Sequence, residues 1–107
     1  PQEKDNAMFF YKFLIRYFNL YSPSFHNRQV MMYVNTIVKD LQEWPGDLDV
    51  MEAIFAYLHK AHCEEHLPFP KERAGEVLSL LQGMDLALLM GDSGKVEDVL
   101  VMLQACM

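Results

Sequence analysis

Residues 8–21 read Met-Phe-Phe-Tyr-Lys-Phe-Leu-Ile-Arg-Tyr-Phe-Asn-Leu-Tyr, and no other stretch of the chain has as much apolar surface to bury. Seven of its fourteen residues are aromatic. Its polar residues Lys12, Arg16 and Asn19 stand at i, i+4 and i+7, which is one narrow stripe on a helix of 3.6 residues per turn. The stretch is therefore predicted to form a helix that is apolar over most of its circumference.

A helix of this kind must be covered on several sides, either at the centre of a bundle or by a partner. We expect the central placement, with the helix largely enclosed, because every other predicted helix offers one apolar face to pack around it. Asp5 lies seven residues before Lys12 and extends the polar stripe, which then marks the seam left in water. If the helix instead lies at the periphery, its surplus of aromatic surface becomes a binding site.

Four further helices are predicted between the clusters of proline and glycine, over about 24–44, 47–66, 70–89 and 95–106. Their apolar residues recur every three or four positions, and no segment shows the period of two that marks a strand. Asp5 or Asn6 is expected to cap the first helix, and Asp47 or Asp49 the third. The chain is predicted to be all-α: a single domain, residues 1–107, of about five antiparallel helices in a bundle or a stack of α-hairpins.

The charge is unevenly distributed along the chain, which carries a net charge of −6. Residues 1–40 hold five bases and three acids, whereas residues 41–107 hold four bases and twelve acids. No basic tract is present that could neutralise several phosphates, so nucleic-acid binding is not expected. An acidic helical domain more often binds other proteins.

The cysteines and the ends of the chain suggest a compartment and a context. Cys63 and Cys106 lie far apart and outside any paired motif, which favours an intracellular location, cytoplasmic or nuclear. The stretch 8–21 is too short for a membrane span and contains two charged residues. The chain starts at Pro1 and stops directly after an amphipathic segment, so we expect a domain excised from a longer protein.

Residues 90–104 read Met-Gly-Asp-Ser-Gly-Lys-Val-Glu-Asp-Val-Leu-Val-Met-Leu-Gln. This segment resembles the turn and second helix of a tetratricopeptide or pentatricopeptide-type repeat, and it has no second copy at a period of 34 or 35 residues. The resemblance implies stacking of α-hairpins and no particular ligand; the alternative is a generic αα-hairpin of an unrelated bundle. The residues that carry it are Gly94, Lys95, Glu97, Asp98, Leu100 and Leu103.

A cluster of His59, His62, Cys63 and His66 is the sharpest chemical feature of the sequence. Imidazole and thiolate are ligands that zinc prefers. However, three ligands from one helix rarely complete a tetrahedral site, and no remote pair of cysteines or histidines is evident. We therefore expect His62 to be a core histidine, His59 and His66 to be solvated and Cys63 to be partly buried, with no cofactor.

No arrangement typical of a catalytic site occurs, so the chain is not expected to be an enzyme. The leading hypothesis is a non-catalytic interaction module, a scaffold or an oligomerisation domain, that binds another protein, a peptide or a second copy of itself. The alternatives are a small zinc-binding regulatory domain that uses the histidine cluster, and a nucleic-acid-binding helical repeat. The candidate partner-binding residues are Phe9, Phe10, Tyr11, Phe13, Phe18 and Tyr21.

Overall fold

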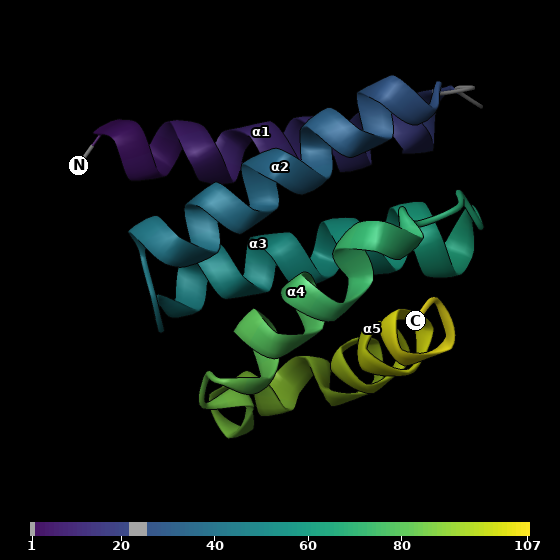
Figure 1. Cartoon of the computed structure of the whole chain (residues 1–107). Coiled ribbons are helices and arrows are strands. Elements are labelled where there is room, and N and C mark those ends of the chain that lie inside the picture. Colours follow the sequence, from purple (N-terminus) through teal and green to yellow (C-terminus); the bar gives the residue numbers. More distant parts are fainter. Residues whose placement is uncertain (1, 22–25) are drawn as a thin grey trace.

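The computed structural model describes residues 2–21 and 26–107, except for the side chains of Met90, Asp92 and Ser93 (Figure 1). The described residues are helical and contain no strand, which confirms the predicted all-α class. The elements are α1 (Gln2–Leu20), α2 (Asn27–Glu43), α3 (Leu48–Leu58), the π-helix η1 (His59–Glu64), α4 (Lys71–Gln82), the 3₁₀ segment η2 (Leu86–Asp92) and α5 (Ser93–Ala105).

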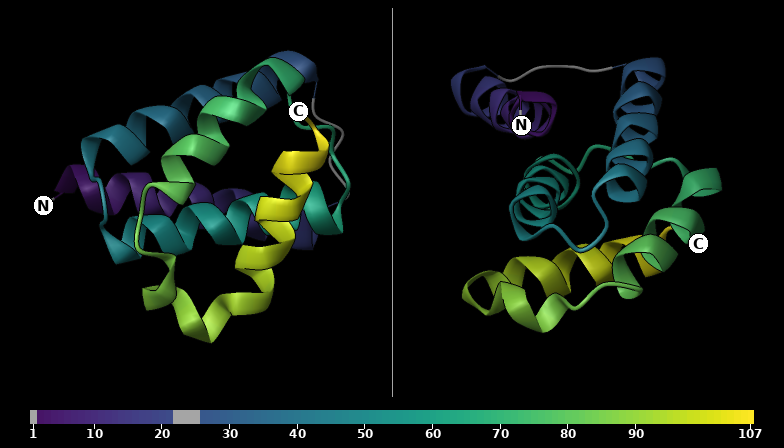
Figure 2. Two further views of the ribbon diagram at one scale, coloured as in Figure 1. Left: turned by 60° about the horizontal axis from the view of Figure 1, so that its bottom comes forward. Right: turned by 90° about the vertical axis from the view of Figure 1, so that its left-hand side faces the viewer.

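The centre of the molecule is α3, and not α1. Helices α1, α2 and α5 all contact α3, and Figure 2 shows α1 lying against α3 with α2 standing to one side. The only charged residues of α3 are Asp49 and Glu52, so its surface is apolar on nearly every side. Seven of its eleven residues are buried. The expectation that residues 8–21 form the enclosed central helix is therefore wrong.

Helix α1 lies at the periphery and buries only one face. The buried side chains are Tyr11, Leu14 and Phe18, spaced three and four residues apart, as expected for a helix with a single packed face. This face meets α3. Within residues 2–21 and 26–107, no other helix covers the opposite face of α1, and Phe9 and Phe13 on that face are largely exposed.

An ion pair links the first turn of α1 to the N-terminus of α3. The Lys4 ammonium donates to the Asp47 carboxylate at 2.9 Å. Asp47 also accepts the backbone N–H of Val50 at 3.2 Å, which confirms it as the N-cap of α3. The prediction that Asp5 or Asn6 caps α1 is wrong, because the helix begins upstream of both residues.

The fourth helix ends earlier than predicted. Gly83 is the C-cap of α4, and its backbone N–H donates to the Ser79 carbonyl. The chain then continues as η2, which is interrupted where Leu89 leaves helical geometry (φ −98°, ψ 31°). Glycine is unfavourable in the interior of a helix. The prediction of one helix as far as residue 89 underestimates this free-energy cost. No helix in the described part of the chain has the length and apolar character needed to cross a bilayer.

Candidate protein-docking face

A row of aromatic side chains runs along the outward face of α1. Phe9, Phe13, Tyr17 and Tyr21 follow one another at intervals of four residues, so they lie one above the other on the helix. Phe9 is 68% exposed and Phe13 is 54% exposed. Large exposed aromatic groups in a continuous row are uncommon on a surface that only meets water.

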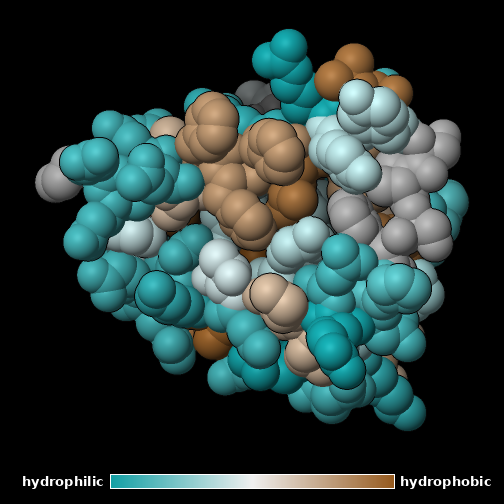
Figure 3. Space-filling view, turned by 90° about the horizontal axis from the view of Figure 1, so that it is seen from above, coloured by the Kyte–Doolittle hydropathy of each residue, from teal (hydrophilic) through white to brown (hydrophobic). Residues whose placement is uncertain are grey.

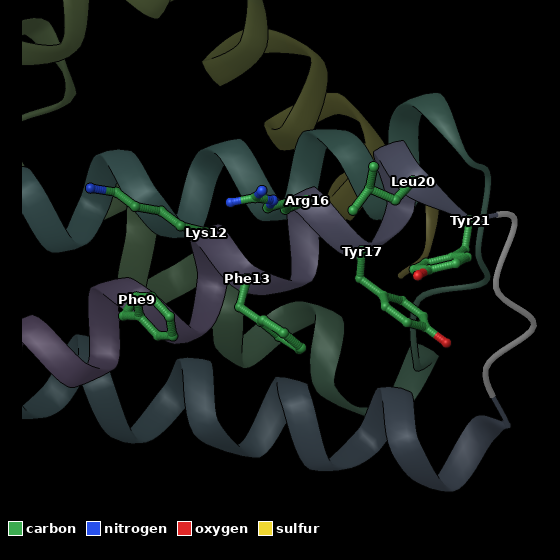
Figure 4. A pocket seen from close by; sticks show the side chains of 7 residues that line it. All are labelled: Phe9, Lys12, Phe13, Arg16, Tyr17, Leu20 and Tyr21. Carbon is green, nitrogen blue, oxygen red and sulfur yellow. The ribbon is translucent and has the colours of Figure 1, made fainter.

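The aromatic row lines a groove of about 580 Å³. Figure 3 shows hydrophobic side chains gathered in one area of this face, with hydrophilic side chains around them. Figure 4 shows Phe9, Phe13 and Tyr17 pointing to the α2 side of α1, with Lys12 and Arg16 on the other side. We call this surface the α1 face; its lining residues are Phe9, Lys12, Phe13, Arg16, Tyr17, Leu20 and Tyr21.

Contacts between neighbouring rings hold the aromatic row in place. The ring centroids of Phe13 and Tyr17 are 6.4 Å apart in a stacked arrangement, and those of Tyr17 and Tyr21 are 5.1 Å apart. Such pairs stabilise a defined arrangement by about 0.5–1.5 kcal/mol each. The rings are therefore partly pre-organised, which lowers the entropic cost of binding.

Buried contacts fix α1 relative to α2. The Tyr11 hydroxyl donates to the Asp40 carboxylate at 2.6 Å, and both side chains are buried. Burial raises the pKa of Asp40, although the hydrogen bond from Tyr11 opposes that shift. Phe10 packs edge-on against Tyr33 of α2, with ring centroids 5.6 Å apart. The α1 face is consequently carried on a well-anchored helix.

The six residues predicted to bind a partner divide into three groups. Phe9, Phe13 and Tyr21 are exposed on the α1 face. Phe10 is half-buried between α1 and α2. Tyr11 and Phe18 are core residues, at 0% and 5% exposure, and their selection as surface residues is wrong because both side chains are buried.

The sequence prediction missed four residues of the α1 face: Tyr17, Leu20, Lys12 and Arg16. The four-residue spacing from Phe9 through Tyr21 already indicated Tyr17. Leu20 follows on the same side and is exposed. The sequence prediction did not distinguish the buried side of the helix, with Tyr11 and Phe18, from its exposed side, with Phe9 and Phe13.

The four residues of the alternative zinc site do not converge. His62 is buried, and its Nδ1 donates to the Leu67 carbonyl at 2.7 Å, which leaves Nε2 without a partner among the described residues. His59 Nε2 lies 3.2 Å from a carboxylate oxygen of Asp98 on α5. The described residues contain no group of three or more histidine, cysteine or acidic side chains placed to hold a metal ion.

The local backbone explains why the histidines separate. His59, His62 and Cys63 lie on the π-helix η1, whose wider turn changes the angle between neighbouring side chains. His66 follows with a positive φ of 56° and is exposed. Cys63 is half-buried, and burial raises the pKa of its thiol, so thiolate formation is disfavoured. The expected core position of His62 is confirmed, whereas His59 is half-buried and paired and so only partly solvated.

A second apolar groove lies at the far end of the molecule, between η2 and α5. Val101 lines this groove and is 56% exposed. Unlike the groove of the α1 face, this groove is lined by no aromatic side chain. It provides a control surface for tests of the α1 face.

No family model, no curated protein and no solved structure matches this chain.

Proposed function

We propose that the chain is a non-catalytic, intracellular interaction module that binds another protein through the α1 face. The observation that supports this most is the exposed row of Phe9, Phe13, Tyr17 and Tyr21, on a helix whose other side is fixed to the core. Aromatic side chains dominate the energy of protein interfaces because they bury a large area with few rotatable bonds.

The dimensions of the α1 face suit a protein segment. From Phe9 to the end of α1 at Leu20 the helix rises about 17 Å, at about 1.5 Å per residue. This length corresponds to a little more than three turns, and the groove beside it is open along that length. A helix from a partner would remove the exposed ring edges from contact with water. The burial of apolar surface is the dominant favourable contribution to the free energy of most protein association.

The zinc and nucleic-acid alternatives have less support. His62 already uses one ring nitrogen for the Leu67 carbonyl, and His59 is paired with Asp98. The cations of the α1 face, Lys12 and Arg16, are too few for the multiple phosphate contacts of a nucleic-acid site.

Site-specific photo-crosslinking tests the proposal. A photoreactive phenylalanine analogue at position 9 or 13 replaces an exposed ring with another ring, so the fold is preserved. The matched control carries the analogue at Val101, which is similarly exposed and lines the second groove. We expect a discrete cross-linked protein from positions 9 and 13 in cells. The same products from all three positions, or none, would refute the α1 face as the docking surface.

A further inference from the structure

We infer that the partner segment is an amphipathic helix with acidic residues along one edge, which lie against Lys12 and Arg16. This inference rests on the proposed function and adds the chemistry of the partner. It is carried by the arrangement of the α1 face: an apolar row on the α2 side and two cations on the other side. Such a pattern is complementary to a helix whose apolar and acidic residues occupy adjacent stripes.

Lys12 and Arg16 lie next to each other and together make one edge of the α1 face positively charged. Lys12 and Arg16 are four residues apart, so they are neighbours along the helix, and both are exposed. Neither forms an ion pair with another described residue, in contrast to Lys4 and Arg73, which are paired with acids. In a chain of net charge −6, this cationic edge at the aromatic groove contrasts with the acidic character of the chain as a whole.

Within the described part of the chain, no acidic side chain forms an ion pair with Lys12 or Arg16. Asp49 and Glu52 of α3 line a smaller pocket of about 170 Å³ together with Lys12, Met8 and Ile15, so Lys12 borders both this pocket and the groove. Arg16 is not part of that pocket. Carboxylates from a partner can therefore approach the two cations from the groove side.

A second copy of the chain suits the α1 face less well. If two α1 faces met antiparallel about a two-fold axis, both cationic edges would fall on the same side of the interface. Like charges placed together in this way oppose association. A distinct acidic helix instead brings opposite charges to the edge.

Designed peptides test the inference directly. Three helical peptides of about 18 residues, long enough to cover the face, share leucines at i, i+3, i+4 and i+7 and differ only in carrying Glu, Gln or Lys along one edge. Fluorescence anisotropy measures their binding to the whole chain. We expect the Glu peptide to bind about tenfold more tightly than the Lys peptide at low ionic strength. The difference should shrink as salt is added.

Charge reversal supplies the matched comparison. The double variant Lys12→Glu with Arg16→Glu should reverse the order of the peptides. The control Lys71→Glu with Lys95→Glu changes the net charge equally at two exposed positions elsewhere, and should keep the original order.

The outcomes separate this inference from the proposed function. Equal affinities for the three peptides, lost on Phe13→Ser, would overturn the acidic edge and leave the docking face standing. Binding of no peptide would overturn the helix inference. If the photo-crosslinks at positions 9 and 13 were also missing, the proposed function would fall with it. Self-association of the chain in sedimentation velocity, abolished by Phe13→Ser, would assign the face to a second copy and overturn the inference.

Discussion

Two phenylalanines of α1, nine residues apart, provide the sharpest test of the placement of that helix. Phe18 is 5% exposed and belongs to the core, whereas Phe9 is 68% exposed on the α1 face. Truncation of a buried phenylalanine to alanine loses the free energy gained by transferring the ring from water to the core, and it leaves a cavity. Phe18→Ala is therefore expected to lower the free energy of unfolding by about 3–5 kcal/mol.

The expected loss for Phe9→Ala is much smaller. A fully buried phenylalanine hides about 150–250 Å², so a side chain buried by one third removes about 60 Å² from water. At about 25 cal/mol per Å² this area contributes about 1.5 kcal/mol. The higher helix propensity of alanine returns about 0.5 kcal/mol. The net loss is about 1 kcal/mol.

Urea unfolding, followed by circular dichroism at low protein concentration, measures both changes. The wild-type chain is expected to be stable by about 5–15 kcal/mol, so both losses fall within a measurable range. Equal losses for the two variants would refute the peripheral placement of α1. A larger loss for Phe9→Ala would restore the central placement.

Three further variants probe the framework that carries the α1 face. Tyr11→Phe removes the donor to the buried Asp40 carboxylate, so we expect a loss of about 1.5–3 kcal/mol in urea unfolding. Asp47→Ala removes the N-cap of α3 together with the partner of Lys4, and about 1–2 kcal/mol should be lost; a loss within error would contradict the cap. Burial lowers the pKa of His62, so as pH falls below about 6.5 the unfolded chain takes up a proton before the folded chain does. Stability should therefore decrease from pH 7.5 to pH 5.5, and His62→Asn, which keeps a donor for the Leu67 carbonyl, should weaken that dependence.

The all-α class could be predicted from the sequence because the period of three to four residues is local information. The choice of the central helix could not be made in the same way. The number of aromatic residues favours residues 8–21, whereas α3 is central because its only charged residues are Asp49 and Glu52. How few polar residues a helix carries, and not how many rings, decides whether all of its sides can be buried.

The two faces of α1 show a second limit. Tyr11 and Phe13 are both aromatic and only two residues apart, yet one is buried and the other is exposed. Helical spacing groups Tyr11 with Leu14 and Phe18, and it groups Phe9 with Phe13 and Tyr17, but it does not say which group meets α3. That choice depends on tertiary packing.

The conformation of the backbone explains why the histidine cluster does not form a metal site. The zinc alternative assumes α-helical angles, under which His59, His62 and His66 share a flank. The π-helix η1 and the positive φ of His66 break that geometry. Neither feature has a local signal as strong as a proline or a glycine pair, so the separation of the ligands follows only from the folded chain.

The central claim is that the α1 face is a docking surface, and NMR mapping of a bound helix tests it most directly. The ¹⁵N-labelled chain is titrated with the Glu-edged peptide, and the change in each amide shift is recorded. We predict that the largest changes fall between Phe9 and Tyr21 and that Phe13→Ser removes them. Largest changes at Leu100 and Val101 in the second groove, or no change at millimolar peptide, would contradict the claim.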